Sequence, residues 1–454
     1  MAVDKGTHTG FALGPKWRRW LSDYGMLLVL ILLCVLFSIL TMTEQHPTGA
    51  AAARALFDDL APTISPSSHV LILAQPNTED SVFAGELQRL LENKGVVSVQ
   101  AVFGDPSTIR SALSGDTVVP IDQLISTHSY APVIQSIKSQ ISRLAQLSVI
   151  TPPSRKWPTF LLAENIRNVA NQITVIAIIA IGMTMVIITA GIDLSVGSLI
   201  ALSAVVVAWI IGQLGGDAAS GSIMLLGALG GIVVCGVTGA FSGFMITRFR
   251  IPPFIATLAM MQVAAGIAYI ISQGKPIYQI PDSFIWLGRG VDPLLKIPNA
   301  VILMVILYII AHLLMSRTTL GRYIYAVGGN EEAARLAGIR VKRVLFFVYT
   351  LCGMLAGLGG VLMSSQLKSG APTYGVTYEL YVIAAVVVGG TSLSGGEGRI
   401  FGTLIGALVI GVIQNGMNLT NVETYTQKVV LGLVILGAVL LDRLKQQKLK
   451  LSGA

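Results

Sequence analysis

Residues that usually carry chemistry are sparse in this chain and show no spacing typical of a reaction centre. Its five histidines and three cysteines lack metal-ligand spacing, and no Ser/His/Asp set or carboxylate pair stands out. The glycine-rich segment GGTSLSGGEG (389–398) lacks the Gly-Lys-Ser/Thr ending of a phosphate-binding loop, and no other ATPase motif accompanies it. We therefore predict that the chain is not an enzyme and has no metal site and no cofactor.

Asp193 is the only acid between two apolar runs, and an ionisable residue near a membrane is a functional candidate. A structural interpretation competes with this one. If Gly191 ends one helix, Asp193 can cap the next, with Ser195 close by. Ser392 holds the matching position in a second copy of the pattern G-x-x-L-S-x-G, at residues 390–396. Because serine can cap but carries no charge, this match favours capping.

A polar, basic stretch, LGRYIYAVGGNEEAARLAGIRVKR, separates two other apolar runs. Within it, Asn330 can cap a short helix, and Glu331 and Glu332 suit the positive end of that helix. Glu331 faces Arg335 four residues on, and Gly338 can close the helix. The sequence therefore predicts a short capped helix in this loop.

One face of this predicted helix is apolar, because Ala333, Leu336 and Ala337 share it. A small amphipathic helix between membrane spans can dock into a groove on a cytosolic partner. The alternative is an ordinary solvated loop, whose basic charge follows from the enrichment of Lys and Arg in cytoplasmic loops.

The composition indicates an all-α protein that crosses the membrane many times. Of its residues 53% are hydrophobic and 12% are charged. The net charge of +8 could suggest nucleic acid, but most basic residues lie in short loops beside apolar runs, where membrane orientation explains them. We therefore predict no nucleic-acid partner.

Ten apolar runs are predicted as membrane helices. The first, at 24–42, is interpreted as a retained helix, although the small residues at 50–53 leave a cleaved signal peptide as the alternative. The others lie at 173–190, 194–212, 222–246, 254–272, 299–315, 344–364, 379–389, 400–417 and 427–441. The distribution of Lys and Arg then places both termini and the loop 316–343 in the cytoplasm.

Residues 43–164 differ in character and predict a small α/β unit outside the cytoplasm, between the first two spans. Strands are expected at 69–74, 97–103 and 117–121, and helices at 79–94, 106–113 and 130–147. The unit is expected to serve docking or gating, or to be an insertion tolerated in an exposed loop. The predicted domains are therefore residues 1–42, 43–164 and 165–454.

Four motifs give the chain a resemblance to a known family. They are AGIDLSVGSLIALSA (190–204), TLAMMQVAAGIAYIISQGKPI (257–277), GRYIYAVGGNEEAARLAGI (321–339) and GGTSLSGGEGRIFGTLIGALVIGVIQNGMNL (389–419). In this order they resemble the permease subunits of bacterial ribose-type monosaccharide ABC importers. The resemblance covers residues 165–441.

The resemblance implies a homodimeric permease in the bacterial inner membrane. Its partners would be a cytoplasmic ATP-binding subunit and a periplasmic sugar-binding protein, and the helix at 330–338 would contact the ATPase. Two departures qualify the match. The unit at 43–164 replaces a short connection, and the segment QVA at 262–264 lacks a basic residue expected there, so the expected solute is a small sugar rather than ribose itself.

Candidate residues follow from this hypothesis. The coupling helix would use Asn330, Glu331, Glu332, Ala333, Arg335, Leu336 and Gly338. Candidates for the translocation path are Gly191, Asp193, Ser195, Gly197, Thr391, Ser392 and Ser394. The alternative function is a membrane sensor whose outer α/β unit binds a ligand, but the chain offers no cytoplasmic segment large enough to form an output domain.

Overall fold

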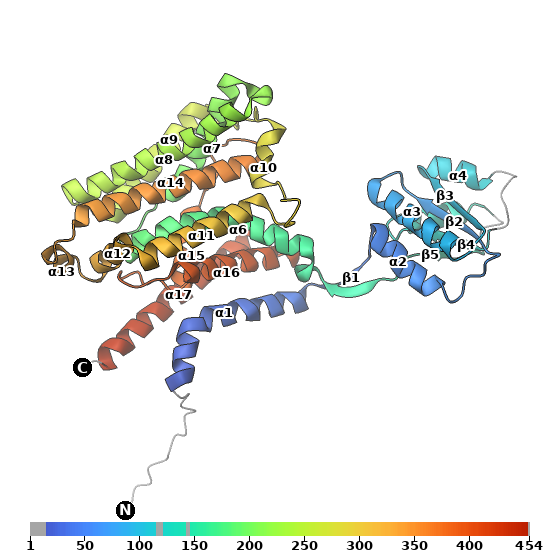
Figure 1. Ribbon diagram of the computed structural model, residues 1–454, viewed down its shortest axis with the longest axis horizontal. Helices are drawn as coiled ribbons and strands as arrows, with labels where there is room; N and C mark the ends of the chain where they lie inside the picture. The colour runs from blue at the N-terminus through green and yellow to red at the C-terminus, as the bar shows by residue number, and fades with distance from the viewer. Residues whose placement is uncertain (1–14, 115–120, 142–145, 453–454) are drawn as a thin grey trace, which may run out of the picture. The chain divides into compact units, whose positions relative to one another are not determined.

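The computed structural model describes residues 15–114, 121–141 and 146–452, and it divides into two compact units (Figure 1). One unit comprises Met1–Thr41 with Phe160–Ala454, and the other comprises Met42–Thr159. We call the first the membrane unit and the second the α/β unit. Residues 1–14, 115–120, 142–145 and 453–454 lie outside the described residues.

The membrane unit is helical. Its longer helices are α1 (Pro15–Leu40), α6 (Ala163–Ile188), α7 (Val196–Leu214), α8 (Gly221–Phe249), α9 (Pro253–Ser272), α11 (Asn299–Arg317), α14 (Val341–Leu367), α15 (Tyr378–Val388), α16 (Ile400–Leu419) and α17 (Thr424–Ser452). Shorter helices are α10 (Ile285–Gly288), α12 (Thr319–Gly329) and α13 (Glu331–Leu336). Short 3-10 turns lie at Thr159–Leu161, Gly216–Ala218 and Asp282–Phe284.

Among the described residues, seven helices are long and apolar enough to cross a membrane. They are α6, α7, α8, α9, α11, α14 and α16. Three shorter apolar helices, at Gly25–Leu40, Tyr378–Val388 and Thr424–Leu440, coincide with the remaining predicted runs. The chain is thus a polytopic membrane protein.

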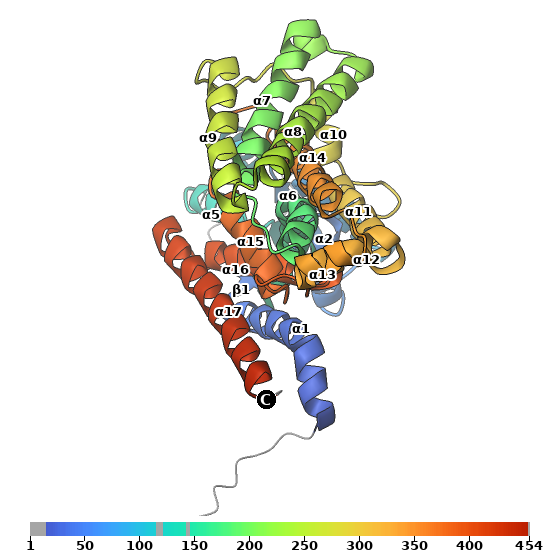
Figure 2. The same cartoon turned by 90° about the vertical axis from the view of Figure 1, so that its left-hand side faces the viewer.

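Helix α6 forms the centre of the membrane unit. Its most apolar window is 89% buried, against 22% for α9, so α6 is enclosed by protein whereas α9 has an open apolar flank. It packs against α11, α14, α15 and α16, as Figure 2 shows in a view along the helices. Glycine permits close packing on this helix: a Cβ added to Gly182 of α6 would lie 2.7 Å from the Cα of Cys352 in α14.

The α/β unit contains a parallel sheet of β2 (His69–Ala74), β3 (Ser98–Phe103), β4 (Gln123–Ser126) and β5 (Val149–Ile150), in the order β3-β2-β4-β5. Its helices are α2 (Gly49–Leu60), α3 (Thr78–Asn93), α4 (Pro106–Ser114) and α5 (Ala131–Lys138). Residues of β2 alternate between two cores, which α2 and α3 cover on one face and α4 and α5 on the other. Strands β1 (Met42–Gln45) and β6 (Arg155–Pro158) form a separate antiparallel pair.

The predicted α/β unit differs from the structure in two details, and one further prediction lies mostly outside the described residues. Of the strand predicted at 117–121, residues 117–120 lie outside the described residues, and the described strand β4 lies at Gln123–Ser126. The helix predicted at 130–147 corresponds to α5, which spans only Ala131–Lys138. Helix α2 was missed, because its alanines at 50–53 were considered as part of a cleavage site.

Candidate functional site

Helix α13 has the local structure that its sequence predicts. The Asn330 Oδ1 accepts a hydrogen bond from the Ala333 backbone N–H at 2.9 Å. Glu331 and Arg335 form an ion pair at 2.6 Å. The residue after the C-cap, Gly338, has φ = +85°, which glycine adopts without strain. The predicted cap, ion pair and glycine stop of this helix are thus confirmed.

The outward face of α13 is apolar and uncovered. Leu336 is 90% exposed, and Ala333 and Ala337 are exposed beside it. By contrast, Ala334 is buried and fixes the opposite face of the helix to the unit. Glu332 is also exposed. Removing an exposed leucine side chain from water is favourable, so this surface is suited to a partner that would cover it.

The last turn of α12, just before α13, packs directly on main-chain atoms of two other segments. A Cβ at Gly328 would collide with the Ile188 carbonyl oxygen at the end of α6 and would approach the Gly396 nitrogen. The Gly396 N–H itself donates to the Ile188 carbonyl at 2.8 Å. Nearby, the Tyr325 hydroxyl donates to the Gly398 carbonyl at 2.8 Å. We call this set of contacts the main-chain junction.

The main-chain junction brings together the two copies of G-x-x-L-S-x-G.

In the first copy, the helix end is not formed by Gly191 as predicted. The residue in the left-handed conformation is Ala190, with φ = +60°, and the Gly191 N–H bonds back to the Val186 carbonyl at 3.0 Å. Gly191 has a different role, because any Cβ there would collide with the Tyr349 hydroxyl.

Asp193 does not cap α7, which corrects the favoured prediction. The N-cap residue is Ser195, and Asp193 stabilises the turn before it. The Asp193 Oδ1 accepts from the Ser195 backbone N–H at 2.9 Å and from the Ser195 hydroxyl at 2.6 Å. Its second oxygen, Oδ2, is buried and has no hydrogen-bond partner among the described residues.

Ser392 likewise does not cap the following helix, since α16 begins at Ile400 with Arg399 as its N-cap. Its hydroxyl oxygen accepts from the Ser394 N–H at 3.2 Å. In both copies the third residue of the pattern therefore accepts a bond from the N–H two residues later. The copies share a turn-stabilising device rather than a helix cap.

The candidate residues for a translocation path are mostly buried in this structure. Gly191, Asp193, Ser195, Gly197, Thr391 and Ser392 are buried, whereas Ser394 is exposed. Sequence reasoning did not single out Glu379, at the start of α15. A Cβ on Gly197 would collide with its carboxylate. An acid at the edge of an apolar run was the available signal.

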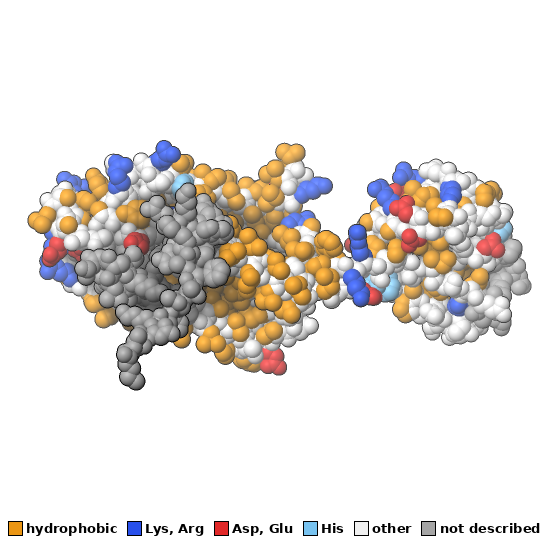
Figure 3. All heavy atoms as spheres, turned by 90° about the horizontal axis from the view of Figure 1, so that it is seen from below, with side chains coloured by type: hydrophobic (Ala, Val, Ile, Leu, Met, Phe, Trp, Pro, Cys, Tyr) orange, Lys and Arg blue, Asp and Glu red, His pale blue; other side chains and the backbone are white. Residues whose placement is uncertain are grey.

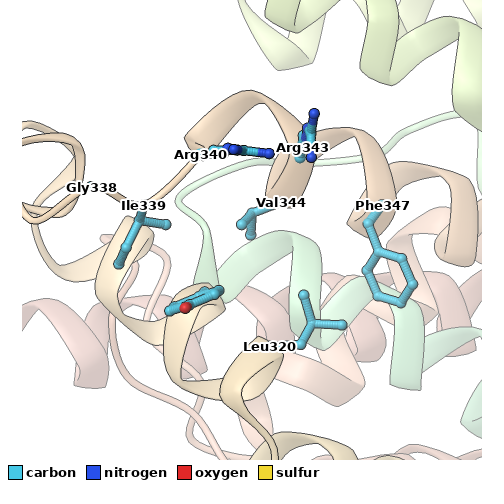
Figure 4. Close-up of a pocket in the computed structure, with 8 residues that line it drawn as sticks. Leu320, Gly338, Ile339, Arg340, Arg343, Val344 and Phe347 are labelled. Carbon is cyan, nitrogen blue, oxygen red and sulfur yellow. The ribbon is translucent and has the colours of Figure 1, made fainter.

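Two cavities flank the segment between α13 and α14. The larger, about 930 Å³, lies between the α6–α7 turn, the α8–α9 connection and the start of α14, and we call it the basic cavity. The smaller, about 400 Å³, lies between α12 and α14, and we call it the interhelical groove. Figure 4 shows the interhelical groove, with Arg340 and Arg343 side by side above the side chains of Leu320, Val344 and Phe347.

Comparison with known proteins assigns the chain to a protein family. Residues 165–439, more than half of its length, match the family model described as branched-chain amino acid transport system, permease component. The chain belongs to this family of permeases. The matched residues contain the α12–α13 segment, the main-chain junction and both cavities, and they exclude the α/β unit.

Relatives of this permease are named for sugars. It is 44% identical over 315 residues to the ribose import permease protein RbsC of Escherichia coli K12, covering 68% of this chain and 95% of that protein. It is 47% identical over 290 residues to RbsC of Bacillus subtilis, covering 63% and 87%. The D-allose permease protein AlsC of E. coli K12 is 39% identical over 285 residues, covering 63% and 85%. No solved structure matches the chain.

These findings confirm the predicted family and the interpretation as a permease subunit of an ABC importer. They give no support to the alternative of a membrane sensor. ATP hydrolysis belongs to a partner subunit in such a system, and this chain supplies the membrane component.

Proposed function

We propose that this permease forms the path by which a small sugar crosses the bacterial inner membrane, with ATP hydrolysed by a cytoplasmic subunit bound at α13. The observation that carries the coupling role is the 90% exposure of Leu336 on a short helix whose cap, ion pair and buried Ala334 all hold it in place. The sugar class is supported by the names of the relatives, which specify ribose, D-allose and L-arabinose.

The proposed topology has ten spans, with both termini and the loop 316–343 in the cytoplasm and the α/β unit outside. Its support is the distribution of charge. Figure 3 shows basic side chains at the end of the membrane unit that carries α13 and hydrophobic side chains along the flank. The side chains of Arg443, Lys445, Lys448 and Lys450 lie outside the described residues, so their part in this orientation rests on the sequence.

Coupling is proposed to pass from α13 through α12 into the main-chain junction. Because Gly328 rests on Ile188 and Gly396, a displacement of α13 moves the ends of both pattern copies together. The buried residues of those copies would line the inner end of the path only after the surrounding helices separate. A second copy of the chain and a periplasmic sugar-binding protein complete the proposed importer, as the family resemblance implies.

Replacing Leu336 by serine tests the coupling surface. Since Leu336 contacts solvent, we expect the Leu336→Ser variant to insert and melt like the parent, while it retains less ATP-binding subunit on co-purification and loses most sugar uptake. Leu294, which is 86% exposed in another loop, provides the matched control Leu294→Ser. If Leu336→Ser co-purifies and transports as well as Leu294→Ser does, α13 is not the docking helix.

A further inference from the structure

The basic cavity concentrates positive charge that the protein itself does not neutralise. Five basic residues and one acid line it: Arg250, Arg335, Arg340, Lys342, Arg343 and Glu331. Glu331 is paired with Arg335. In the described part of the chain no carboxylate forms an ion pair with the other four basic side chains. Cationic side chains therefore outnumber anionic ones around a volume large enough for a ligand.

The start of α14 increases the preference of the cavity for an anion. Arg340 is the N-cap of α14, and the first turn of this helix contains no acid. The positive end of a 27-residue helix thus faces basic side chains, an arrangement that an anion would relieve.

The basic residues border an apolar surface as well as the cavity. Arg340 and Arg343 line both the basic cavity and the interhelical groove. In the groove their guanidinium groups lie above Leu320, Val344 and Phe347, as Figure 4 shows. Cationic groups above apolar side chains match a ligand that has an anionic head and a hydrocarbon part.

We propose that the basic cavity binds the phosphate group of an anionic phospholipid of the inner leaflet, with its first acyl carbons on the apolar floor of the interhelical groove. The position favours lipid over a protein segment, because Arg340 and Arg343 stand where α14 enters its apolar span. Basic pockets between membrane helices on the cytoplasmic side suit lipid headgroups. The bound lipid would contact both the segment between α8 and α9 and the start of α14.

The test compares two triple variants of the full chain, purified in neutral detergent without its ATPase. One variant carries Arg250→Gln, Arg340→Gln and Arg343→Gln. The control carries Arg248→Gln, Arg317→Gln and Arg322→Gln, which removes the same charge from exposed positions outside both cavities. Native mass spectrometry and thermal melting measure the response to phosphatidylglycerol, phosphatidylcholine and inorganic phosphate.

We expect the parent and the control to bind phosphatidylglycerol and to melt at higher temperature with it than with phosphatidylcholine. Binding to the cavity variant should weaken about 100-fold, because each of three basic groups contributes roughly five-fold near a bilayer surface. If the cavity variant does not fold, Arg250→Gln is compared with Arg248→Gln, and a several-fold weakening confined to Arg250→Gln is expected.

Three results would overturn the proposal. They are equal phosphatidylglycerol binding by cavity and control variants, equal stabilisation by phosphatidylcholine, and protection by inorganic phosphate that matches protection by phosphatidylglycerol. The first result together with a loss of ATPase co-purification would assign the arginines to protein docking. Because lipid binding is measured without the ATPase, its failure would leave the coupling role of α13 untouched.

Discussion

Gly328 and Gly329 are consecutive residues in the last turn of α12, and their surroundings are opposite. A Cβ at Gly328 would collide with the Ile188 carbonyl oxygen, whereas one at Gly329 would meet nothing within 4 Å. We predict that Gly328→Ala lowers stability by about 1–3 kcal/mol through overpacking. Gly329→Ala should be neutral or slightly stabilising, because alanine favours a helix.

Thermal melting of the purified variants measures this difference, and sugar uptake by cells reports its effect on coupling. Gly328→Ala should reduce uptake more than the loss of folded protein explains, since it separates α12 from both turns. Equal melting temperatures for the two variants would show that α12 does not rest on the main-chain junction.

Two substitutions of Asp193 separate the effect of its charge from the effect of its hydrogen bonds. Asparagine retains an acceptor for the Ser195 N–H and hydroxyl, so Asp193→Asn should preserve folding and most uptake. Asp193→Ala leaves two donors without that partner in a buried turn, at a cost of about 1–3 kcal/mol. If Asp193→Asn abolishes uptake in a stably folded protein, the carboxylate charge acts in transport.

At the scale of elements, the sequence predicted those features that depend on residues a few positions apart. The cap at Asn330, the Glu331–Arg335 pair and the stop at Gly338 each involve neighbours within a single helix. The positions of the long apolar helices were also predictable, because a span shows its character in every residue. Both signals are local.

Features that depend on distant segments were not predictable. Gly191 resembles a helix breaker in sequence, but Tyr349 from α14 is what excludes a side chain there. The contact of Gly328 with Ile188 and Gly396 joins three separate parts of the chain, and no periodicity reports it. Ser195 rather than Asp193 is the N-cap of α7, because Asp193 accepts two bonds from Ser195 in the turn before the helix.

At the scale of the molecule, the α/β unit begins and ends on adjacent strands. Met42 of β1 pairs with Pro158 of β6, and antiparallel partners have Cα atoms about 5 Å apart. We therefore predict that residues 43–157 can be replaced by a two-residue turn without loss of membrane insertion or of the melting transition of the membrane unit.

Uptake by this shortened permease then reports what the α/β unit contributes. Full uptake would identify the unit as dispensable for transport, and loss of uptake with a normal melting transition would assign it a part in receiving the sugar. Failure of the shortened chain to insert would contradict the structural independence of the two units. A glycine-serine linker of the same length as residues 43–157 serves as the control.

The contacts of the main-chain junction also constrain how this permease can diverge. The bond from the Gly396 N–H to the Ile188 carbonyl joins two main-chain groups. It therefore survives replacement of the isoleucine side chain. A single methyl group at Gly328, in contrast, would push the same segments apart. Mutational tolerance should thus be very uneven over a few ångströms. The surrounding side chains can therefore diverge between relatives while the main-chain contacts of the junction are inherited unchanged.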